Sequence, residues 1–403
     1  MKKKILIVSS FLWMWGVEKA LISLVKSIPK DKYDVSLCFV NKNDEYIKSF
    51  SRDVKLLDVS VKREIDMSFW MNSAIREEIN RWNFYNVLIL FIGYAEKIIF
   101  NSNNILKSFL FKEQDKEFDY IFNFRWPSIF TSIVSEDVFK CRKKFIWIHN
   151  DFFSFVKKKN VLSKCIMCLK KLLYRNIFKY DYVFCVSNEI GDRFKSVYDN
   201  INNVETLYNI IDKNSILWLW NWKWFSDHFK WLRILSVWRL VWMKWFDIAV
   251  KVFSKLKKKY KDIRWYIIWD WSEKDNLVKL IKEYHLDNDF LLLGEKDNPY
   301  PFIKSCDLYI QTSRVESFLS LEGFCLTLAE AKIFNSSIVS TMFPWAKEQL
   351  FNYGRWILVN YSVDDILWAI DNMIRDNFLK DYLVDLRSDK TLSSSFIDLE
   401  KYL

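Results

Sequence analysis

The sequence predicts an α/β protein with two domains, each built on a parallel β-sheet. Short apolar runs alternate with helical patterns from the first residues onward, which is typical of a parallel sheet covered by helices. The alternation breaks in a polar, tryptophan-rich stretch at 213–230, the expected linker, and then restarts. A chain of 403 residues with 51% hydrophobic residues is also long enough to bury two cores.

The apolar runs give the expected positions of the strands. In the first half they lie at 5–9, 35–40, 54–59, 120–124, 145–149, 182–186 and 204–208. In the second half they lie at 234–237, 266–268, 290–293, 308–311 and 337–340. Helices are expected at 17–28, 246–258, 273–284, 324–334 and 363–374, and the chain from 376 looks helical. The region 66–116 fits neither pattern and is left unassigned.

These elements divide the chain into an N-terminal domain at 1–215, a C-terminal domain at 216–380 and a helical tail at 381–403. We expect the tail to pack back on the N-terminal domain. The two domains are expected to face a central cleft, with ligands at the carboxyl ends of the strands.

The net charge of +11 and the pI of about 9.0 suit nucleic acid, an anionic membrane surface or a phosphorylated ligand. Abundant lysine, asparagine, isoleucine and phenylalanine are also what an AT-rich genome would produce. The charge concentrates at 157–179, where lysines and Arg175 interleave with apolar residues at helical spacing. We therefore expect a membrane-surface role for this segment and no nucleic-acid partner.

The sequence contains no apolar run long enough to span a membrane, and Met1 is followed closely by a strand pattern. Both features favour a cytoplasmic protein, with peripheral attachment at the inner membrane face as an option. The seven cysteines lie in apolar stretches, as expected in a reducing compartment. Cys165 and Cys168 form a close pair but lack two further ligands nearby, so we expect no metal site.

Glycine and tryptophan occur in unusual numbers. The chain has 6 glycines, whereas about 28 would be usual for this length, and it has 20 tryptophans. The two counts together approach the usual glycine count alone. Most tryptophans therefore stand where glycine is expected.

The first strand leads into Phe11-Leu12-Trp13-Met14-Trp15-Gly16-Val17, a loop that opens a helix. With glycine at 13 and 15, backbone N–H groups and the helix start could approach an anion or a sugar closely. Trp15 and Gly16 are therefore candidates for a glycine loop. The pattern is shared with dinucleotide-binding folds and does not define a function by itself.

The second domain opens with Ile234-Leu235-Ser236-Val237-Trp238-Arg239-Leu240-Val241-Trp242-Met243-Lys244-Trp245-Phe246-Asp247. With glycine at 238 and 245, this segment resembles glycosyltransferase family 4, whose fold is GT-B: two Rossmann-like parallel-sheet domains facing a cleft. The resemblance assigns Arg239 and Lys244 to the donor diphosphate. A guanidinium and an ammonium can stabilise the charge that grows on such a leaving group without a metal.

Two further segments extend the resemblance. Tyr266-Ile267-Ile268-Trp269-Asp270-Trp271 resembles the family's I-I-G-D-G turn. Leu293-Gly294-Glu295-Lys296-Asp297-Asn298-Pro299-Tyr300 resembles the loop that passes beside the nucleotide base in members acting on surface polysaccharides. Asn298 is therefore a candidate donor-binding residue.

The strongest motif is Glu322-Gly323-Phe324-Cys325-Leu326-Thr327-Leu328-Ala329-Glu330. Eight residues of helix rise about 12 Å, roughly the distance from the sugar to the ribose of a nucleotide sugar. By resemblance Glu322 binds the donor sugar, Glu330 holds the ribose, and the amides of Gly323, Phe324 and Cys325 face the donor. The segment 316–321 precedes the motif and is a near-copy of it, so Glu316 is a rival for Glu322, although only Glu322 keeps the spacing to Glu330.

His149 ends a predicted strand and resembles the family's histidine loop, in which the histidine contacts the donor sugar or the acceptor near the reacting carbon. A structural histidine is the alternative. The resemblance implies a retaining, metal-independent enzyme without a cofactor, which uses a UDP- or GDP-sugar and a glycan or lipid-linked acceptor. Its N-terminal domain would bind the acceptor and its C-terminal domain the donor.

Two alternatives to a transferase remain. A nucleotide-sugar epimerase or a phosphorylase would keep the fold, although the Glu322–Glu330 spacing favours transfer. A noncatalytic carbohydrate-binding protein would use the tryptophans as sugar platforms, for which the cluster at 218–224 is suited.

Some bacteria read the UGA codon as glycine, and translating UGA as tryptophan would produce the observed pattern. We expect glycine in the living protein at Trp13, Trp15, Trp238, Trp245, Trp269, Trp271, Trp345 and Trp356. Trp147 is expected to be genuine because related sequences carry an aromatic residue there. The sequence does not decide Trp70, Trp82, Trp126, Trp218, Trp220, Trp222, Trp224 and Trp368.

Overall fold

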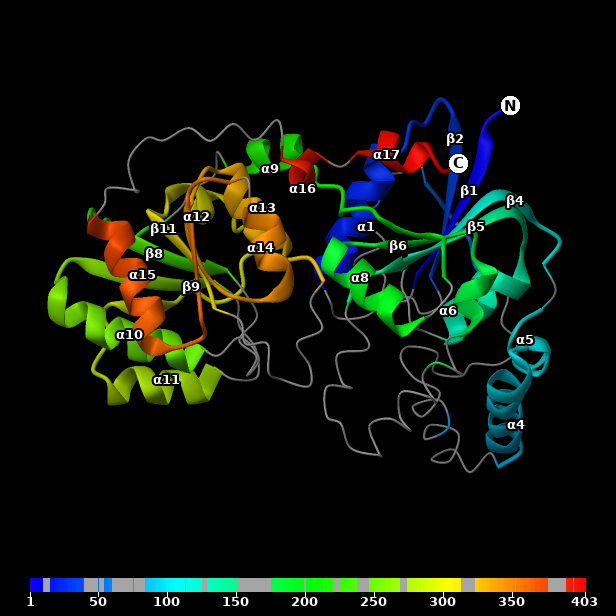
Figure 1. The fold of residues 1–403 in the computed structure, drawn as a ribbon, viewed down its shortest axis with the longest axis horizontal. Helices are drawn as coiled ribbons and strands as arrows, with labels where there is room; N and C mark the ends of the chain where they lie inside the picture. The colour runs from blue at the N-terminus through cyan, green and yellow to red at the C-terminus, as the bar shows by residue number, and fades with distance from the viewer. Residues whose placement is uncertain are drawn as a thin grey trace. The chain divides into compact units, whose positions relative to one another are not determined.

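The computed structural model divides the chain into two compact units (Figure 1). Unit 1 comprises Met1–Ile211, Leu321–Phe324 and Ser394–Leu403, and unit 2 comprises Asp212–Ser320 and Cys325–Ser393. The structure describes residues 1–9, 15–39, 50, 54–59, 75, 84–112, 114–124, 129–150, 171, 175–198, 201–220, 225–237, 246–268, 274–312, 323–351, 353–375, 389–393 and 395–403.

Unit 1 is built on a parallel sheet of seven strands in the order β3-β2-β1-β4-β5-β6-β7. The strands are β1 (Lys3–Ser9), β2 (Tyr33–Phe39), β3 (Lys55–Leu56), β4 (Glu117–Asn123), β5 (Lys140–Ile148), β6 (Tyr182–Cys185) and β7 (Val204–Thr206). Because β1 pairs with both β2 and β4, the strand order reverses there. Ligands of doubly wound folds bind at the carboxyl ends of the strands at such a point.

The helices of unit 1 connect these strands. They are α1 (Trp15–Ser27), α4 (Phe84–Phe100), α5 (Asn104–Leu110), α6 (Ile129–Ile133), α8 (Asn188–Val197) and α17 (Phe396–Glu400), with the π-helix η1 (Val134–Val138) and the 3-10 helix η3 (Arg175–Lys179). Helices α4 and α5 lie side by side because α4 has a glycine at the contact. A Cβ on Gly93 would come within 2.5 Å of the Leu106 side chain.

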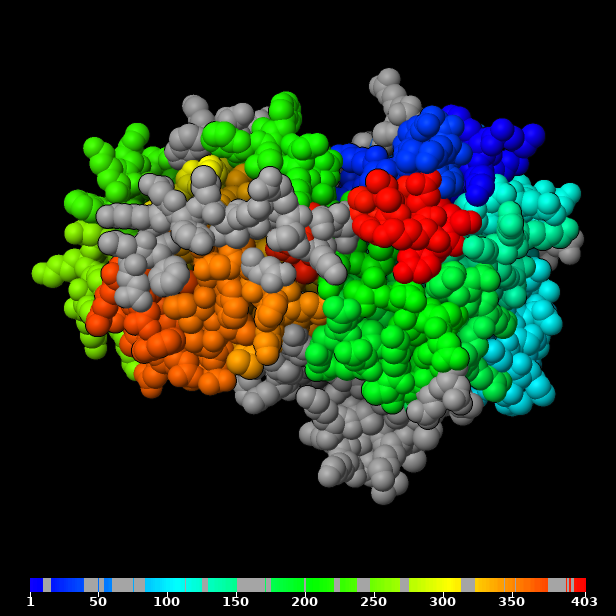
Figure 2. Space-filling view, turned by 45° about the horizontal axis from the view of Figure 1, so that its top comes forward, coloured from blue at the N-terminus to red at the C-terminus, as the bar shows by residue number. Residues whose placement is uncertain are grey.

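The last residues of the chain lie on unit 1 (Figure 2). Glu400 accepts hydrogen bonds from Lys32 at 3.0 Å and from the Tyr33 hydroxyl at 3.1 Å. The Tyr402 ring contacts Tyr182 and Phe184, with ring centroids 4.9 and 5.1 Å away. This segment thus joins β2 to β6 across one end of the sheet.

Unit 2 contains a parallel sheet of six strands in the order β10-β9-β8-β11-β12-β13. The strands are β8 (Leu232–Val237), β9 (Ile263–Ile268), β10 (Phe290–Leu292), β11 (Leu308–Gln311), β12 (Ser337–Thr341) and β13 (Trp356–Val359). The order reverses between β8 and β11, which pair directly. The helices are α9 (Lys213–Leu219), α10 (Phe246–Lys259), α11 (Lys274–Glu283), α12 (Tyr300–Ser305), α13 (Leu326–Ile333), α14 (Pro344–Leu350), α15 (Val363–Arg375) and α16 (Lys390–Ser393).

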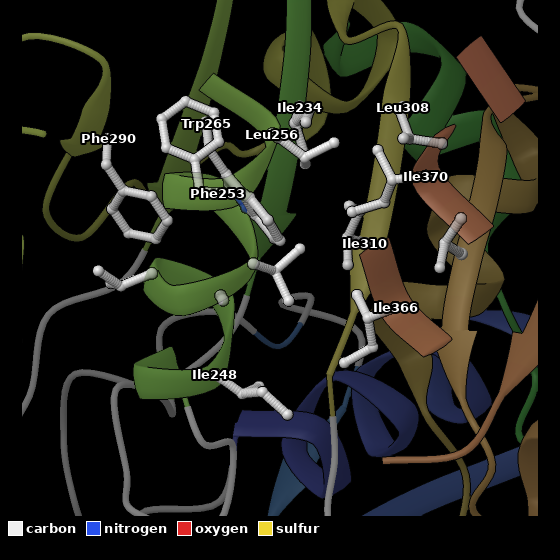
Figure 3. Close-up of a cluster of buried hydrophobic side chains, with 14 of the residues drawn as sticks. Ile234, Ile248, Phe253, Leu256, Trp265, Phe290, Leu308, Ile310, Ile366 and Ile370 are labelled. Carbon is white, nitrogen blue, oxygen red and sulfur yellow. The ribbon is translucent and has the colours of Figure 1, made fainter. Parts of the chain in front are cut away.

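The core of unit 2 forms where helices α10 and α15 pack on the sheet (Figure 3). Phe253 of α10, Trp265 of β9 and Phe290 of β10 meet there, with ring centroids 5.6 to 6.1 Å apart. The indole nitrogen of Trp265 donates to the Ser236 hydroxyl at 3.1 Å. The strands therefore read as continuous apolar runs, as expected of a sheet covered on both faces.

The predicted pair of Rossmann-like parallel-sheet domains is confirmed. Several details differ from the prediction, and helices α8, α12 and α14 are among the elements that the sequence patterns did not indicate. Helix α9 lies inside the segment expected to be a linker, and α4 and α5 occupy the unassigned region. Strand β13, a run of four residues at the edge of the sheet, was also not predicted. Within the described ranges, the helices fall short of the length and apolar character that a membrane span requires.

Candidate functional site

Several predicted site residues lie outside the described residues: Arg239, Lys244, Glu322 and the rival Glu316. Their chain positions are nevertheless informative. Segment 238–245 follows β8 and segment 313–322 follows β11. Because β8 and β11 are neighbours at the point where the strand order reverses, both strands end where an α/β fold commonly receives its ligand. Trp15 is the first residue of α1, and Gly16, the second, is exposed.

His149 follows β5 and is buried in unit 1, with 5% of its surface exposed. Its Nε2 lies 2.9 Å from the carbonyl oxygen of Phe124, and its ring contacts the Phe124 ring at a centroid distance of 4.6 Å. A carbonyl oxygen only accepts hydrogen bonds, so the contact places a proton on Nε2. In the neutral imidazole, Nδ1 is then the acceptor.

Gly323 contacts the histidine loop directly. A Cβ at this position would lie 2.1 Å from the His149 carbonyl oxygen and 2.2 Å from Cδ1 of Ile190. No side chain fits there, so the requirement for glycine is steric. The adjacent Phe324 is buried, and its ring centroid lies 6.2 Å from that of Tyr208. The structure thus brings together His149 and Gly323, which the sequence indicated separately.

Glu330 lies on α13 in unit 2 and is 3% exposed. The hydroxyl of Tyr300, on α12, donates a hydrogen bond to Oε1 of Glu330 at 3.2 Å. Tyr300 is also buried, and burial, together with the nearby Glu330 carboxylate, raises the pKa of its hydroxyl far above the usual value. Tyr300 therefore stays protonated and serves as a donor to the carboxylate.

Cys325 is the N-cap of α13 and is fully buried. Its sulfur lies 3.4 Å from the Thr327 hydroxyl, and its carbonyl accepts the first hydrogen bond of the helix from Ala329. Gly323 and Phe324 belong to unit 1, whereas Cys325 belongs to unit 2. The chain therefore passes from one unit to the other within the predicted motif.

Asn298 connects the loop before α12 to the end of α9. Its Oδ1 accepts a hydrogen bond from the Tyr300 amide at 3.1 Å, and its Nδ2 donates to the Leu219 carbonyl at 2.8 Å. The side chain that was predicted to bind the donor thus fixes the start of α12, and with it Tyr300.

Sequence reasoning missed three residues near the carboxyl ends of β8 and β11. Tyr300 is part of the segment 293–300, but the sequence assigned no role to it. The Tyr309 hydroxyl lies 3.4 Å from both the Val237 carbonyl and Oε1 of Gln311, and Tyr309 and Gln311 are buried. The signal for these two was a pair of polar groups at positions 309 and 311, on the same face of an otherwise apolar strand.

The part of the chain that the structure describes contains no group of three histidine, cysteine, aspartate or glutamate side chains suited to a metal ion. Cys165 and Cys168, the close pair in the sequence, lie outside it.

Residues 223–388 match the family described as Glycosyl transferases group 1. This region includes Arg239, Lys244, Asn298, Glu322 and Glu330, so the predicted likeness of the second domain to glycosyltransferases is confirmed. The finer assignments to family 4, to retention and to metal independence stay predictions.

Two curated proteins and one solved structure extend this finding. An uncharacterised glycosyltransferase of Methanocaldococcus jannaschii is 30% identical over 53% of this chain and 52% of its own length. A Campylobacter jejuni protein named as an N-acetylgalactosamine-N,N'-diacetylbacillosaminyl-diphospho-undecaprenol 4-alpha-N-acetylgalactosaminyltransferase is 29% identical over 36% of this chain and 38% of its own. Anabaena HepE, solved in complex with UDP, superposes with a TM-score of 0.62 at 13% identity, covering 100% of this chain and 96% of HepE.

This chain thus spans about half the length of the first relative and less of the second. The structural likeness confirms the predicted GT-B fold.

Proposed function

We propose that this chain is a glycosyltransferase that moves a sugar from a UDP- or GDP-sugar to a glycan or lipid-linked acceptor in cell-surface polysaccharide synthesis. The observation that carries the proposal is Glu330, a carboxylate buried on α13 within the region that matches Glycosyl transferases group 1. A buried carboxylate needs hydrogen-bond donors, and the ribose hydroxyls of a nucleotide sugar can supply them.

The comparisons support this choice of substrates. HepE was solved with UDP, which favours a uridine nucleotide as donor. The name of the Campylobacter relative describes an acceptor on diphospho-undecaprenol, which favours a lipid-linked glycan.

The proposed roles follow the resemblance. Arg239 and Lys244 neutralise the diphosphate as the glycosidic bond breaks, and Glu322 binds the sugar hydroxyls. Glu330 binds the ribose, and His149 contacts the donor sugar or the acceptor hydroxyl. The two cations make a metal unnecessary, and we propose no cofactor. Retention would follow a front-side mechanism, in which the leaving phosphate takes the proton of the incoming hydroxyl.

A transfer assay tests the proposal. The protein is prepared in two forms. One carries the tryptophans of the sequence, and the other, the glycine form, carries glycine in place of Trp13, Trp15, Trp238, Trp245, Trp269 and Trp271. Each is incubated with UDP- and GDP-sugars, with and without polyprenyl-linked glycan acceptors. Arg239→Ala and Lys244→Ala should each lower turnover by orders of magnitude with a smaller change in donor affinity, because the charge grows in the transition state.

Matched carboxylate variants control this assay. Glu322→Gln should change the rate and the choice of donor sugar, whereas Glu316→Gln should have little effect. The reverse result would move the first carboxylate of the motif to Glu316. An altered sugar nucleotide formed without acceptor would instead indicate an epimerase, and sugar phosphate formed from glycan and phosphate would indicate a phosphorylase.

We also propose attachment to an anionic membrane surface, through helix α4. The segment expected to bind lipid, 157–179, lies largely outside the described residues. Helix α4 gives separate support because seven of its aromatic and aliphatic residues are exposed, whereas Asn86, Leu90 and Lys97 are buried. The exposed set is Phe84, Tyr85, Leu88, Phe91, Ile92, Ile99 and Phe100, exposed by 43% to 73%.

The surroundings of α4 favour a lipid surface. The Arg175 guanidinium donates to the Ile99 carbonyl at 2.8 Å, and Phe178, in the same 3-10 helix as Arg175, is 52% exposed. Exposed aromatic and aliphatic side chains beside a cation suit the interface of a bilayer with anionic headgroups. The location that we propose is therefore the cytoplasmic face of the membrane.

We further propose that UGA codons encode glycine at the tryptophans named above. Two buried tryptophans illustrate the difference between a genuine and a misread position. Trp265 donates its indole hydrogen to Ser236, whereas the buried Nε1 of Trp345 has no hydrogen-bond partner among the described residues. An unpaired buried donor costs about 1 to 3 kcal/mol, so a smaller residue suits position 345 better.

The coding sequence tests this proposal directly. UGA is expected at the codons for Trp13, Trp15, Trp238, Trp245, Trp269 and Trp271, and also for Trp345 and Trp356, with UGG at Trp147. Mass spectrometry of the native protein should find glycine at the UGA positions. UGG codons at the loop positions would refute the recoding hypothesis.

A further inference from the structure

We propose that Tyr300 is a positioning residue that fixes the Glu330 carboxylate for the ribose hydroxyls of the donor nucleotide. This inference rests on the function proposed above and adds a residue to which the sequence motifs give no role. Its basis is the hydrogen bond of 3.2 Å from the Tyr300 hydroxyl to Oε1 of Glu330.

The first step of the argument is the geometry of the carboxylate. A glutamate side chain has three rotatable torsions, so its carboxylate can occupy several orientations unless a neighbour fixes it. Tyr300 donates to one carboxylate oxygen from a separate helix, α12. This contact fixes the plane of the carboxylate and, with it, the direction of the other oxygen, Oε2.

The second step is the support of Tyr300 itself. The Asn298 side chain accepts from the Tyr300 amide and donates to Leu219, so the first turn of α12 is tied to the end of α9. The Tyr300 ring also packs near Phe334 at the end of α13, with a centroid distance of 6.2 Å. Tyr300 is thus held at both its backbone and its ring, as a residue that positions another one must be.

The third step is the protonation state. Burial keeps the Tyr300 hydroxyl protonated at any physiological pH, so it always donates to the carboxylate. The ribose hydroxyls then meet a carboxylate whose orientation is fixed. The predicted consequence is that the hydroxyl of Tyr300 affects recognition of the ribose, and not of the base or the diphosphate.

The test compares two nucleotides and two tyrosines in the glycine form of the full chain. Calorimetry measures the affinity of Tyr300→Phe for UDP and for 2′,3′-dideoxy-UDP, which lacks the ribose hydroxyls. We expect Tyr300→Phe to bind UDP about tenfold more weakly than the glycine form without this substitution, which is the effect of losing one hydrogen bond to a charged group. The affinity for the dideoxy analogue should be unchanged, and the donor KM should rise with little change in kcat.

The matched control is Tyr353→Phe. Tyr353 is also fully buried in unit 2, but its hydroxyl donates to the Ser336 carbonyl at 2.5 Å. Removing that hydroxyl should lower the melting temperature without changing the affinity for UDP. A second variant pair, Tyr300→Phe in the Glu330→Gln background, should show a much smaller loss of UDP affinity than Tyr300→Phe alone.

Three outcomes would overturn the inference. Equal weakening for UDP and its dideoxy analogue would make Tyr300 a structural residue, and an unchanged UDP affinity would make its hydroxyl irrelevant. A full effect in the Glu330→Gln background would show that Tyr300 acts through another group. If the wild type binds neither UDP nor GDP, the proposed function itself fails, which is a distinct result.

Discussion

Each unit buries a lysine beside a carboxylate, but within the described residues the lysine donates hydrogen bonds beyond its carboxylate partner in unit 2 and not in unit 1. In unit 2 both members are hydrogen-bonded. Asp389 accepts from the Thr391 amide and hydroxyl at 2.9 and 2.6 Å, and Lys332 follows Glu330 by two residues on α13. Its ammonium lies 2.5 Å from Asp389, and it donates to the Thr391 hydroxyl at 2.8 Å and to the Gln349 carbonyl. Lys332 thus joins α13 to α14 and α16.

In unit 1 the hydrogen bonds converge on Glu136 of η1. It accepts from Asn176 and from the Tyr180 hydroxyl, the latter at 3.1 Å, and it pairs with Lys179 at 3.5 Å. Lys97 of α4 lies 3.8 Å away, and its Nζ has no hydrogen bond within the described residues. In this pair the lysine therefore has fewer hydrogen bonds within the described residues than the carboxylate.

The two pairs differ in how far hydrogen bonds stabilise the buried charge of the lysine. Burial lowers the pKa of both lysines, although a carboxylate opposes this effect in each pair. Burial also raises the pKa of Glu136, against the effect of Lys97. A buried charge is tolerated where hydrogen bonds replace its water shell, so the well-bonded member should cost more to remove.

The largest expected effect is at Lys332. Lys332→Met removes the charge that stabilises Asp389 in the interior, so unit 2 should lose about 3 to 5 kcal/mol of unfolding free energy. Urea unfolding measures the loss. Lys259→Met is the control, because Lys259 pairs with Asp371 while 44% exposed and should change stability by less than about 1 kcal/mol. Equal losses for both variants would contradict the interpretation.

In unit 1 the hydrogen bonds lie on the carboxylate, so the two members of the pair should differ in what their removal costs. Glu136→Gln leaves two lysines without their carboxylate and should cost about 3 kcal/mol. Lys97→Met should change stability by about 1 kcal/mol or less, because Glu136 keeps Lys179 and its hydrogen bonds. Urea unfolding of the two single variants checks the order. If Lys97→Met proves the costlier change, the hydrogen bonds do not decide which charge matters.

The sequence predicted the strands and the fold because apolar periodicity reports burial of whole segments. It did not predict the two buried pairs, since Glu136 is 39 residues from Lys97 and Asp389 is 57 from Lys332. Such partners meet through tertiary packing, which no local pattern encodes. Helix α4 was left unassigned for a related reason: seven of its aromatic and aliphatic residues are exposed while Lys97 is buried, so periodicity does not identify the buried face.

Sequence reasoning could indicate only those candidate site residues that lie within sequence motifs. Resemblance indicated Gly323 and His149 as candidates, and the structure shows that the backbones of the two are in close contact. Tyr300 and Glu330 are 30 residues apart, and only the packing of α12 on α13 makes them partners.

A partly exposed charge should give a smaller effect, and one that depends on pH. Burial opposes the charge on Asp227, but hydrogen bonds from Tyr266, Phe229, Arg233 and Arg264 outweigh burial and lower its pKa to about 2. A lowered folded pKa contributes stability above pH 3.8, which is lost as the pH falls towards 2. Asp227→Asn should cost about 2 kcal/mol at pH 6, and the difference from wild type should shrink below pH 4. Urea titrations across this range measure it, and a constant difference would contradict the assignment.

The smallest effect on stability is expected on the outer face of α4, whose exposed residues we propose to bind lipid rather than to stabilise the fold. Leu88→Ser combined with Phe91→Ser removes exposed apolar surface, so unfolding free energy should change by less than about 0.5 kcal/mol. Binding to vesicles that contain anionic lipid should nevertheless weaken by roughly tenfold or more, because each side chain buried in lipid contributes more than about 1 kcal/mol.

The control is Phe351→Ser in unit 2, where the side chain is 69% exposed and lies outside this face. Sedimentation with vesicles at low and high salt separates the apolar from the ionic contribution. If the control weakens binding as much as the α4 variant, the exposed stripe of unit 1 does not bind lipid, and its outward apolar residues require another explanation.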